Sequence, residues 1–198
     1  MIIKSYLLEQ NIEHLNKFNI FLFYGENQGL KKQFKEKINK LNAGETLNLY
    51  QEEIIKNKNL LFNEISNKSL FDEKKNIIIN EADDKILETI EEIEKLVKEE
   101  KVYIFSNNLD KKSKLRSFFE KNKQLGLTAC YPDNEITIRK LISSRLKHLN
   151  GFSNEVLNTI IQATDNDRNK VINEIDKIIS CFANQTIDKS KLISLLNL

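Results

Sequence analysis

The stretch Ile20-Phe21-Leu22-Phe23-Tyr24-Gly25-Glu26-Asn27-Gln28-Gly29 decides the fold class of this 198-residue chain. Its first half is a continuous apolar run of β-forming side chains, which is typical of a strand buried on both faces of a sheet. A glycine turn follows, and it leads into a predicted helix whose apolar face is Leu30, Phe34, Ile38 and Leu41. A strand, a glycine turn and a helix in this order form the framework of a phosphate-binding loop.

Strands and helices continue to alternate after this unit. Further strands are predicted at Glu45–Tyr50, Asn76–Asn80, Val102–Phe105 and Gly126–Tyr131. Between them, the apolar spacing predicts helices with these inward side chains: Ile54, Leu61 and Ile65; Ile86, Leu87, Ile90, Ile93, Leu96 and Val97; and Leu115, Phe118 and Phe119, the last helix being capped by Asp110. This alternation indicates an α/β class with a parallel sheet covered by helices on both faces.

The only proline, Pro132, marks a change in the pattern. No strand is predicted beyond it, and helices are expected at Glu135–Leu149, Ser153–Thr164, Asp167–Ala183 and Asp188–Asn197, with Ser153 as an N-cap. The sequence therefore predicts an α/β domain over residues 1–132 and a small all-helical domain over residues 133–198.

Composition bounds the function classes. The formal net charge is only +2 although 30% of the residues are charged, so any contact with nucleic acid must be local. Cys130 and Cys181 lie far apart in apolar surroundings, which favours buried, reduced thiols over a disulfide. No apolar run reaches the length of a membrane span and no signal peptide is recognised, so we expect a cytoplasmic protein.

The glycine turn departs from a working phosphate-binding loop. Such a loop needs a glycine before its lysine and a Ser or Thr after it, which here correspond to Leu30, Lys31 and Lys32. Such a loop also needs a magnesium-binding aspartate at the end of a neighbouring strand, and this position is occupied by Asn80. We therefore predict that ATP is not hydrolysed and that Gly25 and Gly29 serve a tight turn, leaving a degenerate nucleotide loop of Gly25, Gly29 and Lys31.

Two other groups of residues are candidate metal or catalytic sites. His14 and His148 have no neighbouring motif that indicates a metal site or a catalytic triad. The acidic cluster of Glu81, Asp83 and Asp84 at a strand end suits either a metal ion or helix capping. The sequence thus indicates no catalytic residue and no metal site.

Lysines dominate the predicted helix that follows residue 110, from Lys111 to Lys123. Lys111, Lys112, Lys114 and Arg116, with Lys121 and Lys123 further on, either contact DNA phosphates or form a solvated face. Glu120 interrupts this basic segment, which favours the solvated face.

An apolar pair, Leu70 and Phe71, follows Ser69 in the polar connection between a predicted helix and the strand that starts at Asn76. Successive residues point in different directions on a helix, so this pair does not continue the apolar stripe before it. Either the pair inserts into a partner's pocket, as compact anchors do in many interfaces, or it folds back and closes the end of the core.

Several segments occur together in a recognisable order: the defective phosphate loop, Ser69-Leu70-Phe71, and Leu109-Asp110-Lys111-Lys112-Ser113-Lys114-Leu115-Arg116. The helical part adds Asp165-Asn166-Asp167-Arg168 and Asn173-Glu174-Ile175-Asp176-Lys177. With these segments the chain resembles the delta subunit of the bacterial DNA polymerase III clamp loader over nearly its whole length.

The resemblance implies an AAA+-like, P-loop NTPase-like domain followed by a helical lid domain, with no ATP hydrolysis and no cofactor. In that family an apolar pair inserts into a pocket of the sliding clamp and favours its open form, and the matching residues are Leu70 and Phe71, preceded by Ser69. The implied partners are the sliding clamp (beta subunit), the tau/gamma and delta prime subunits and DNA, with no membrane. The chain would then be a non-catalytic subunit of the DNA polymerase III holoenzyme, a nucleotidyltransferase complex acting in DNA replication.

One departure from the family concerns its third domain, a helical collar. The sequence stops at Leu198, where the second domain should end, so we expect the collar to be absent. Either the sequence is a fragment or the protein docks without a collar. Two alternative functions stay open: an AAA+-type ATPase with an aberrant phosphate loop that uses Lys31 and Glu81, and a DNA-binding module that uses the segment Lys111–Lys123.

Overall fold

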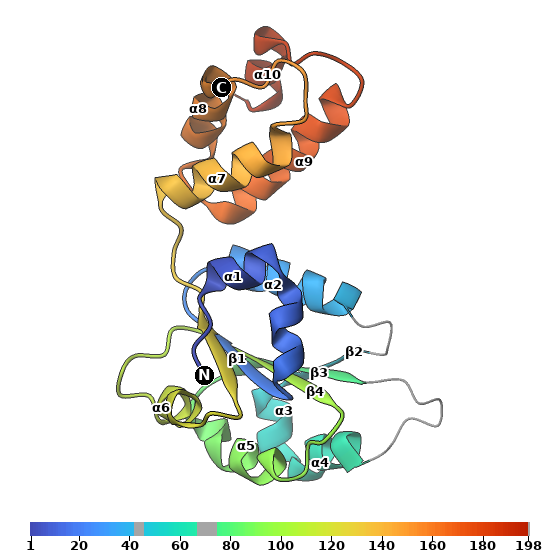
Figure 1. Cartoon of the computed structure of the whole chain (residues 1–198), viewed down its shortest axis with the longest axis vertical. Coiled ribbons are helices and arrows are strands. Elements are labelled where there is room, and N and C mark those ends of the chain that lie inside the picture. Colours follow the sequence, from blue (N-terminus) through green and yellow to red (C-terminus); the bar gives the residue numbers. More distant parts are fainter. Residues whose placement is uncertain (42–45, 67–74, 198) are drawn as a thin grey trace. The chain divides into compact units, whose positions relative to one another are not determined.

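The computed structural model describes residues 1–41, 46–66 and 75–197. The chain forms two compact units, Met1–Tyr131 and Pro132–Leu198. In the first unit, five parallel strands form one sheet in the order β2-β3-β4-β1-β5 (Figure 1). The strands are β1 (Ile20–Tyr24), β2 (Thr46–Tyr50), β3 (Asn76–Ala82), β4 (Lys101–Ser106) and β5 (Gly126–Ala129). These are the strands that the sequence predicts, with β3 extended by two residues, β4 extended by one at each end and β5 shortened by two. The predicted first residue of β2, Glu45, lies outside the described residues.

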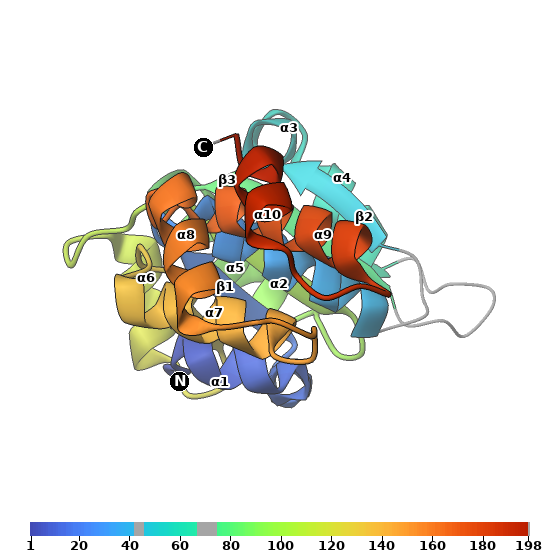
Figure 2. The same ribbon diagram turned by 90° about the horizontal axis from the view of Figure 1, so that it is seen from above.

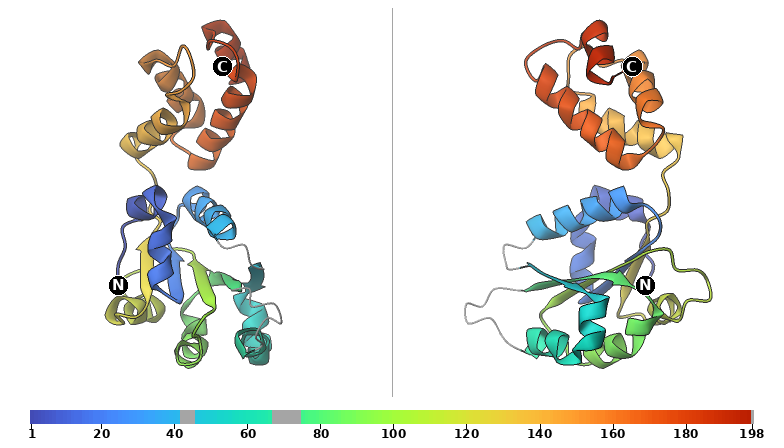
Figure 3. Two further views of the ribbon diagram at one scale, coloured as in Figure 1. Left: turned by 45° about the vertical axis from the view of Figure 1, so that its right-hand side comes forward. Right: turned by 180° about the vertical axis from the view of Figure 1, so that it is seen from behind.

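Helices cover both faces of the sheet (Figure 3). One face carries α1 (Ser5–Gln10), the 3-10 helix η1 (Ile12–Lys17) and α2 (Gln28–Leu41); the other carries α3 (Gln51–Lys56), α4 (Lys58–Ser66), α5 (Leu87–Glu94) and α6 (Lys114–Lys121). Along β1, Phe21 and Phe23 point to the first face and Ile20 and Leu22 to the second. All of β1 is buried, which explains why its sequence is apolar without alternation.

The helical stripes predicted for this unit are confirmed in most positions. Leu30, Phe34 and Ile38 of α2 are buried, and Leu41 is half-buried at the end of that helix. The stripe of Ile54, Leu61 and Ile65 is buried as well, but it is shared between α3 and α4.

The predicted helix from Ile86 to Val97 is wrong at both ends. The 3-10 helix η2 (Asp84–Ile86) precedes α5, and α5 ends at Glu94. The amides of Leu96 and Val97 both donate to the Ile93 carbonyl at 2.9 Å, so the chain turns tightly there on its way to β4. Val97 still reaches the core, but Leu96 is 47% exposed. The helical spacing of apolar residues in the sequence therefore continues past the point at which α5 ends.

The predicted cap of α6 is also wrong. Ser113 is the N-cap, and its side-chain oxygen accepts a hydrogen bond from the Arg116 amide at 3.1 Å. Asp110 instead closes the preceding turn, where Oδ1 accepts from the amides of Lys112 and Ser113 at 2.7 and 3.0 Å. Leu115 and Phe119 are buried as predicted, and Phe118 is half-buried.

The second unit is built from α7 (Glu135–Leu146), α8 (Asn154–Thr164), α9 (Arg168–Phe182) and α10 (Lys189–Leu195), which surround one apolar core (Figure 2). Ser153, Asp167 and Asp188 are N-caps whose side chains each accept from an amide three residues on. The predicted helices are confirmed, although α7 ends three residues earlier than expected. The described part of this unit, residues 132–197, contains no strand.

Both cysteines are free thiols. Cys130 is fully buried, as predicted, whereas Cys181 is only half-buried. Cys181 lies on α9 at the margin of the helical core, where the surface is partly open.

Candidate functional site

The degenerate nucleotide loop lies at the carboxyl end of β1, where Gly25 has a φ of +127°. A Cβ atom at this position would lie 2.3 Å from the carbonyl oxygen of Cys130 on the neighbouring strand end. Both the dihedral angle and the close approach require glycine. Gly29 lies inside α2 and has no such restriction. The predicted role of a tight turn therefore fits Gly25 and not Gly29.

Asn27 caps the helix that follows the turn. Its Oδ1 accepts a hydrogen bond from the Leu30 amide at 2.9 Å, and its side chain is buried. In a phosphate-binding loop, amides at this helix end face the bound anion. Here one of them is already bonded to a side chain of the loop itself.

Lys31 points into the protein. Its Nζ donates a hydrogen bond to the Ser106 carbonyl oxygen at 2.8 Å, and the residue is only 4% exposed. Burial lowers the pKa of Lys31, the nearby Cys130 raises it in part, and Lys35 lowers it further. In a working loop this ammonium would bind a phosphate, whereas here the Lys31 ammonium is bonded to Ser106, the last residue of β4.

Asn80, at the end of β3, is also part of an internal network. Its Nδ2 donates to the Leu49 carbonyl at 3.2 Å, and its Oδ1 accepts from Lys35 Nζ. The Lys35 ammonium lies 4.6 Å from the ring centroid of Phe105, and burial lowers its pKa while the charge of Glu81 raises it in part. Asn80 occupies the position at which a magnesium-binding aspartate is expected, and it is hydrogen-bonded to Lys35 instead.

We expect Lys31→Met to have an unfolding free energy at pH 7 equal to that of the parent or higher by up to about 1.5 kcal/mol, because it removes a charge buried at some cost. The pKa of Lys31 lies below its ordinary value of 10.5 in the folded state, so the unfolded chain binds this proton more tightly. Stability of the parent therefore rises as the pH increases towards 10.5, and the variant lacks this component.

Urea unfolding at pH 7 and pH 10 measures both effects, with the exposed Lys32→Met as the control. A loss above about 2 kcal/mol in Lys31→Met would mean that the bond to Ser106 outweighs the cost of burial.

Two members of the acidic cluster, Asp83 and Asp84, accept hydrogen bonds at the starts of helices. Asp83 Oδ1 accepts from the Lys85 amide at 2.8 Å and from Gln51 Nε2 at 2.9 Å. Glu81 is exposed with a φ of 56°, a strained value for a residue with a side chain. Among residues 1–41, 46–66 and 75–197, no group of three or more His, Cys, Asp or Glu side chains is arranged to hold a metal ion.

Asp84 holds the start of α6. Its carboxylate accepts from Ser113 Oγ at 2.6 Å and from the amides of Leu115 and Lys114 at 2.9 and 3.0 Å. Burial raises the pKa of Asp84, but these hydrogen bonds outweigh it and the net pKa is lowered. The carboxylate favours the helix because it faces the positive end of the helix dipole.

Arg116 differs from the neighbouring lysines, because its guanidinium is bound within the protein. Its guanidinium donates to Glu120 Oε1 at 2.8 Å and to the Leu109 carbonyl at 3.1 Å, and lies 5.0 Å from the ring centroid of Tyr24. The bond to Glu120 raises the pKa of Arg116. Its side chain is only 16% exposed. The predicted basic helix from Lys111 to Lys123 is too long, because α6 begins at Lys114 and ends at Lys121. Of the four predicted DNA contacts, Lys111, Lys112 and Lys114 are exposed, while Arg116 is bound within the protein.

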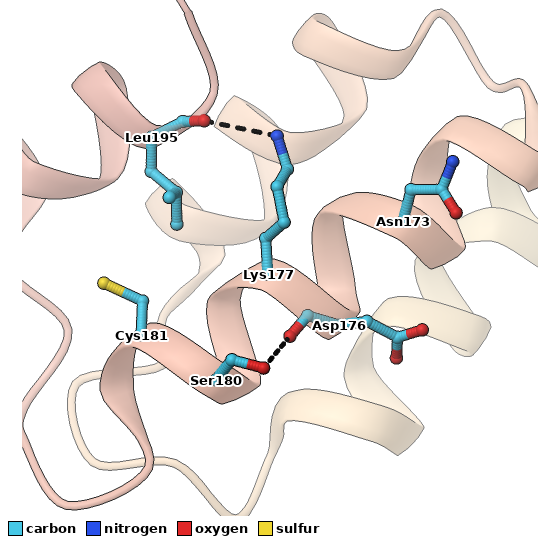
Figure 4. Close-up of a pocket in the computed structure, with 6 residues that line it drawn as sticks. All are labelled: Asn173, Asp176, Lys177, Ser180, Cys181 and Leu195. Atoms are coloured by element: carbon cyan, nitrogen blue, oxygen red, sulfur yellow. Dashed lines mark hydrogen bonds between the residues drawn. The ribbon is translucent and has the colours of Figure 1, made fainter.

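The second unit carries an open hollow of about 670 Å³ between α9 and α10 (Figure 4). It is lined by Asn173, Asp176, Lys177, Ser180, Cys181 and Leu195. Its charged groups have partners, since Asp176 pairs with Arg145 at 3.0 Å and Lys177 with Glu174 at 2.6 Å. The hollow contains none of the predicted site residues.

The predicted clamp-binding residues Ser69, Leu70 and Phe71 lie outside the described residues, in the connection between α4 and β3. In the described part of the chain, no helix is long and apolar enough to cross a membrane.

No protein-family model matches the sequence, and no curated protein matches it either. Solved structures do match in fold. The Bacillus subtilis DNA clamp loader delta protein has a TM-score of 0.68 at 11% identity, over 97% of this chain and 62% of that one. Drosophila ORC bound to DNA has a TM-score of 0.51 at 15% identity, over 96% and 65%. Thermotoga maritima RuvB has a TM-score of 0.54 at 10% identity, over 98% and 66%.

This chain thus spans less than two thirds of the length of the clamp loader delta protein and nearly two thirds of the other two. At these identities the similarity concerns the fold. The parallel sheet flanked by helices, together with these neighbours, shows that the chain has a P-loop NTPase-like α/β fold.

Proposed function

We propose that this chain is a clamp-loader-delta-like subunit that binds a sliding clamp, favours the open form of the clamp during DNA replication, and does not hydrolyse ATP. One observation carries the proposal: the phosphate loop is satisfied internally, with Asn27 on the Leu30 amide and Lys31 on the Ser106 carbonyl. An AAA+-like fold with such a loop suits a subunit that acts by binding. The similarity to the Bacillus subtilis delta protein over 97% of this chain supports the same function.

In this proposal Leu70 and Phe71 are the apolar plug, and Ser69 precedes them. Burial of the two side chains contributes about 1.5 to 3 kcal/mol each. Association costs roughly 4 to 15 kcal/mol, so neighbouring residues must add contacts. The plug favours opening only if it binds the open clamp more tightly than the closed one, because a ligand shifts an equilibrium by its differential affinity alone.

The proposed partners are the sliding clamp, the tau/gamma and delta prime subunits of the loader, and DNA. Sister subunits would supply ATP binding and hydrolysis. Contacts with DNA would involve the exposed Lys111 and Lys112 in the turn before α6 and Lys114 at its start. Arg116 would support this turn from within through its bond to the Leu109 carbonyl.

The experiment that tests this function is binding of the purified chain to the sliding clamp of the same organism, with and without ATP. We expect binding without nucleotide, and a loss of at least tenfold in affinity in the double variant Leu70→Ala with Phe71→Ala. The matched control is Leu96→Ala with Ile136→Ala, which removes two apolar side chains that are 47% and 64% exposed elsewhere. This control should bind as the parent does.

If the double variant binds the clamp as tightly as the parent, Leu70 and Phe71 are not the residues that insert into the clamp. A folded parent chain that does not bind the clamp would contradict the proposed function itself. In that case Mg-ATP turnover that disappears in Lys31→Met would favour the AAA+-type ATPase that uses Lys31 and Glu81.

A further inference from the structure

The connection between the two units is anchored on its first side by Asn27. The Asn27 backbone amide donates to the Cys130 carbonyl at 3.0 Å, and its Nδ2 donates to the Tyr131 carbonyl at 3.1 Å. Asn27 is only 8% exposed, so its own groups are largely shielded from water, and the bond to the Tyr131 carbonyl is part-buried. The last two residues of the first unit are therefore fixed to the phosphate-loop turn.

The second side is anchored by an ion pair inside the helical unit. Arg168 Nη1 donates to both carboxylate oxygens of Asp133, at 2.9 and 3.1 Å. The two side chains are 4% and 6% exposed. Thr137 Oγ1 on α7 also donates to Asp133 Oδ1 at 2.8 Å. The first residues of the second unit are thereby fixed to the start of both α7 and α9.

Only one residue, Pro132, lies between Tyr131, whose carbonyl is bonded to Asn27, and Asp133, whose carboxylate is bonded to Arg168. The chain passes from one compact unit to the other between Tyr131 and Pro132. The ring of Pro132 fixes its own φ at about −65° and restricts the backbone of Tyr131. Few backbone torsions are therefore free to rotate at this point.

We infer that Asn27 and the Asp133–Arg168 ion pair form a two-sided hinge anchor, which confines movement between the units to the backbone torsions from Tyr131 to Asp133. Because Asn27 also caps α2, the conformation of the phosphate-loop turn and that of the hinge are coupled through one side chain. The anchor consists of residues of this chain alone and needs no bound nucleotide. The inference stands independently of the proposed clamp binding.

The test is the distribution of distances between two spin labels, one in each unit, measured by pulsed electron paramagnetic resonance. Labels are attached at Glu91→Cys on α5 and Asn158→Cys on α8, both exposed positions, in a Cys181→Ser background. Cys130 remains because it is fully buried.

The decisive variant is Asn27→Asp. It keeps an oxygen that caps α2 but removes the donor to the Tyr131 carbonyl, so α2 should stay intact. We expect the width of the distance distribution at least to double. The matched control is Asn11→Asp, the same change at the exposed cap of η1, where Oδ1 accepts from the Glu13 amide. Its distribution should equal that of the parent.

A second variant, Asp133→Asn with Arg168→Met, releases the other anchor while removing both charges of the pair. It should widen the distribution to a similar extent. If the parent is already as broad as these variants, or if both variants stay folded by circular dichroism and keep the parent's width, the hinge anchor does not exist.

Discussion

Gly25→Ala is expected to lower the unfolding free energy of the first unit by on the order of 4 kcal/mol, or to prevent its folding. Two costs add at this position. A residue with a side chain is strained at a φ of +127°, and its Cβ would lie 2.3 Å from the Cys130 carbonyl oxygen. That oxygen belongs to the backbone and accepts the Asn27 amide, so it cannot move aside without disturbing the turn.

Thermal unfolding followed by circular dichroism measures this loss, and Gly29→Ala is the matched control. Gly29 lies four residues after Gly25, within α2 and without a positive φ, where alanine favours a helix by about 0.5 to 1 kcal/mol over glycine. A Gly25→Ala protein as stable as the parent would mean that β1 and β5 adjust their spacing at this point.

Local patterns allowed most elements of both units to be predicted, but not α1 and η1, whose segment before Phe18 is polar with scattered leucines. The run from Ile20 to Tyr24 predicted a fully buried strand, and Asp167 and Asp188 marked helix starts that the structure confirms. The end of α5 could not be predicted, because Leu96 and Val97 continue the helical period. The turn there arises from the need to reach β4, which is a property of the tertiary structure.

The contacts that define the site join residues far apart in sequence. Asp84 accepts a hydrogen bond from the amide of Lys114, 30 residues later at the start of α6, and Asn27 donates to the carbonyl of Tyr131, 104 residues away. The sequence gives the type of each side chain but not the partner across the fold. Arg116 was therefore grouped with neighbouring lysines, although its guanidinium is bound within the protein.

Arg168→Met is expected to unfold the helical unit or to lower its unfolding free energy by about 3 to 5 kcal/mol, because it leaves the buried Asp133 carboxylate without its cationic partner. At about 0.05 to 0.15 kcal/mol per residue, a unit of this size has a total stability of roughly 3 to 10 kcal/mol. The expected loss is therefore comparable to the whole.

The double variant Asp133→Asn with Arg168→Met should recover most of this stability, since replacing both charges of a buried pair is often neutral. The measurement is the circular dichroism of the helices at 222 nm during heating. The control is Arg145→Met, which removes the exposed ion pair between Arg145 and Asp176. Loss of such an exposed pair costs about 0 to 1 kcal/mol. A single variant no less stable than this control would mean that Thr137 and the other neighbours of Asp133 suffice to hold its charge. Equal losses in the single and double variants would instead assign the cost to lost packing of the Arg168 side chain, because only an electrostatic cost disappears when its partner is neutralised.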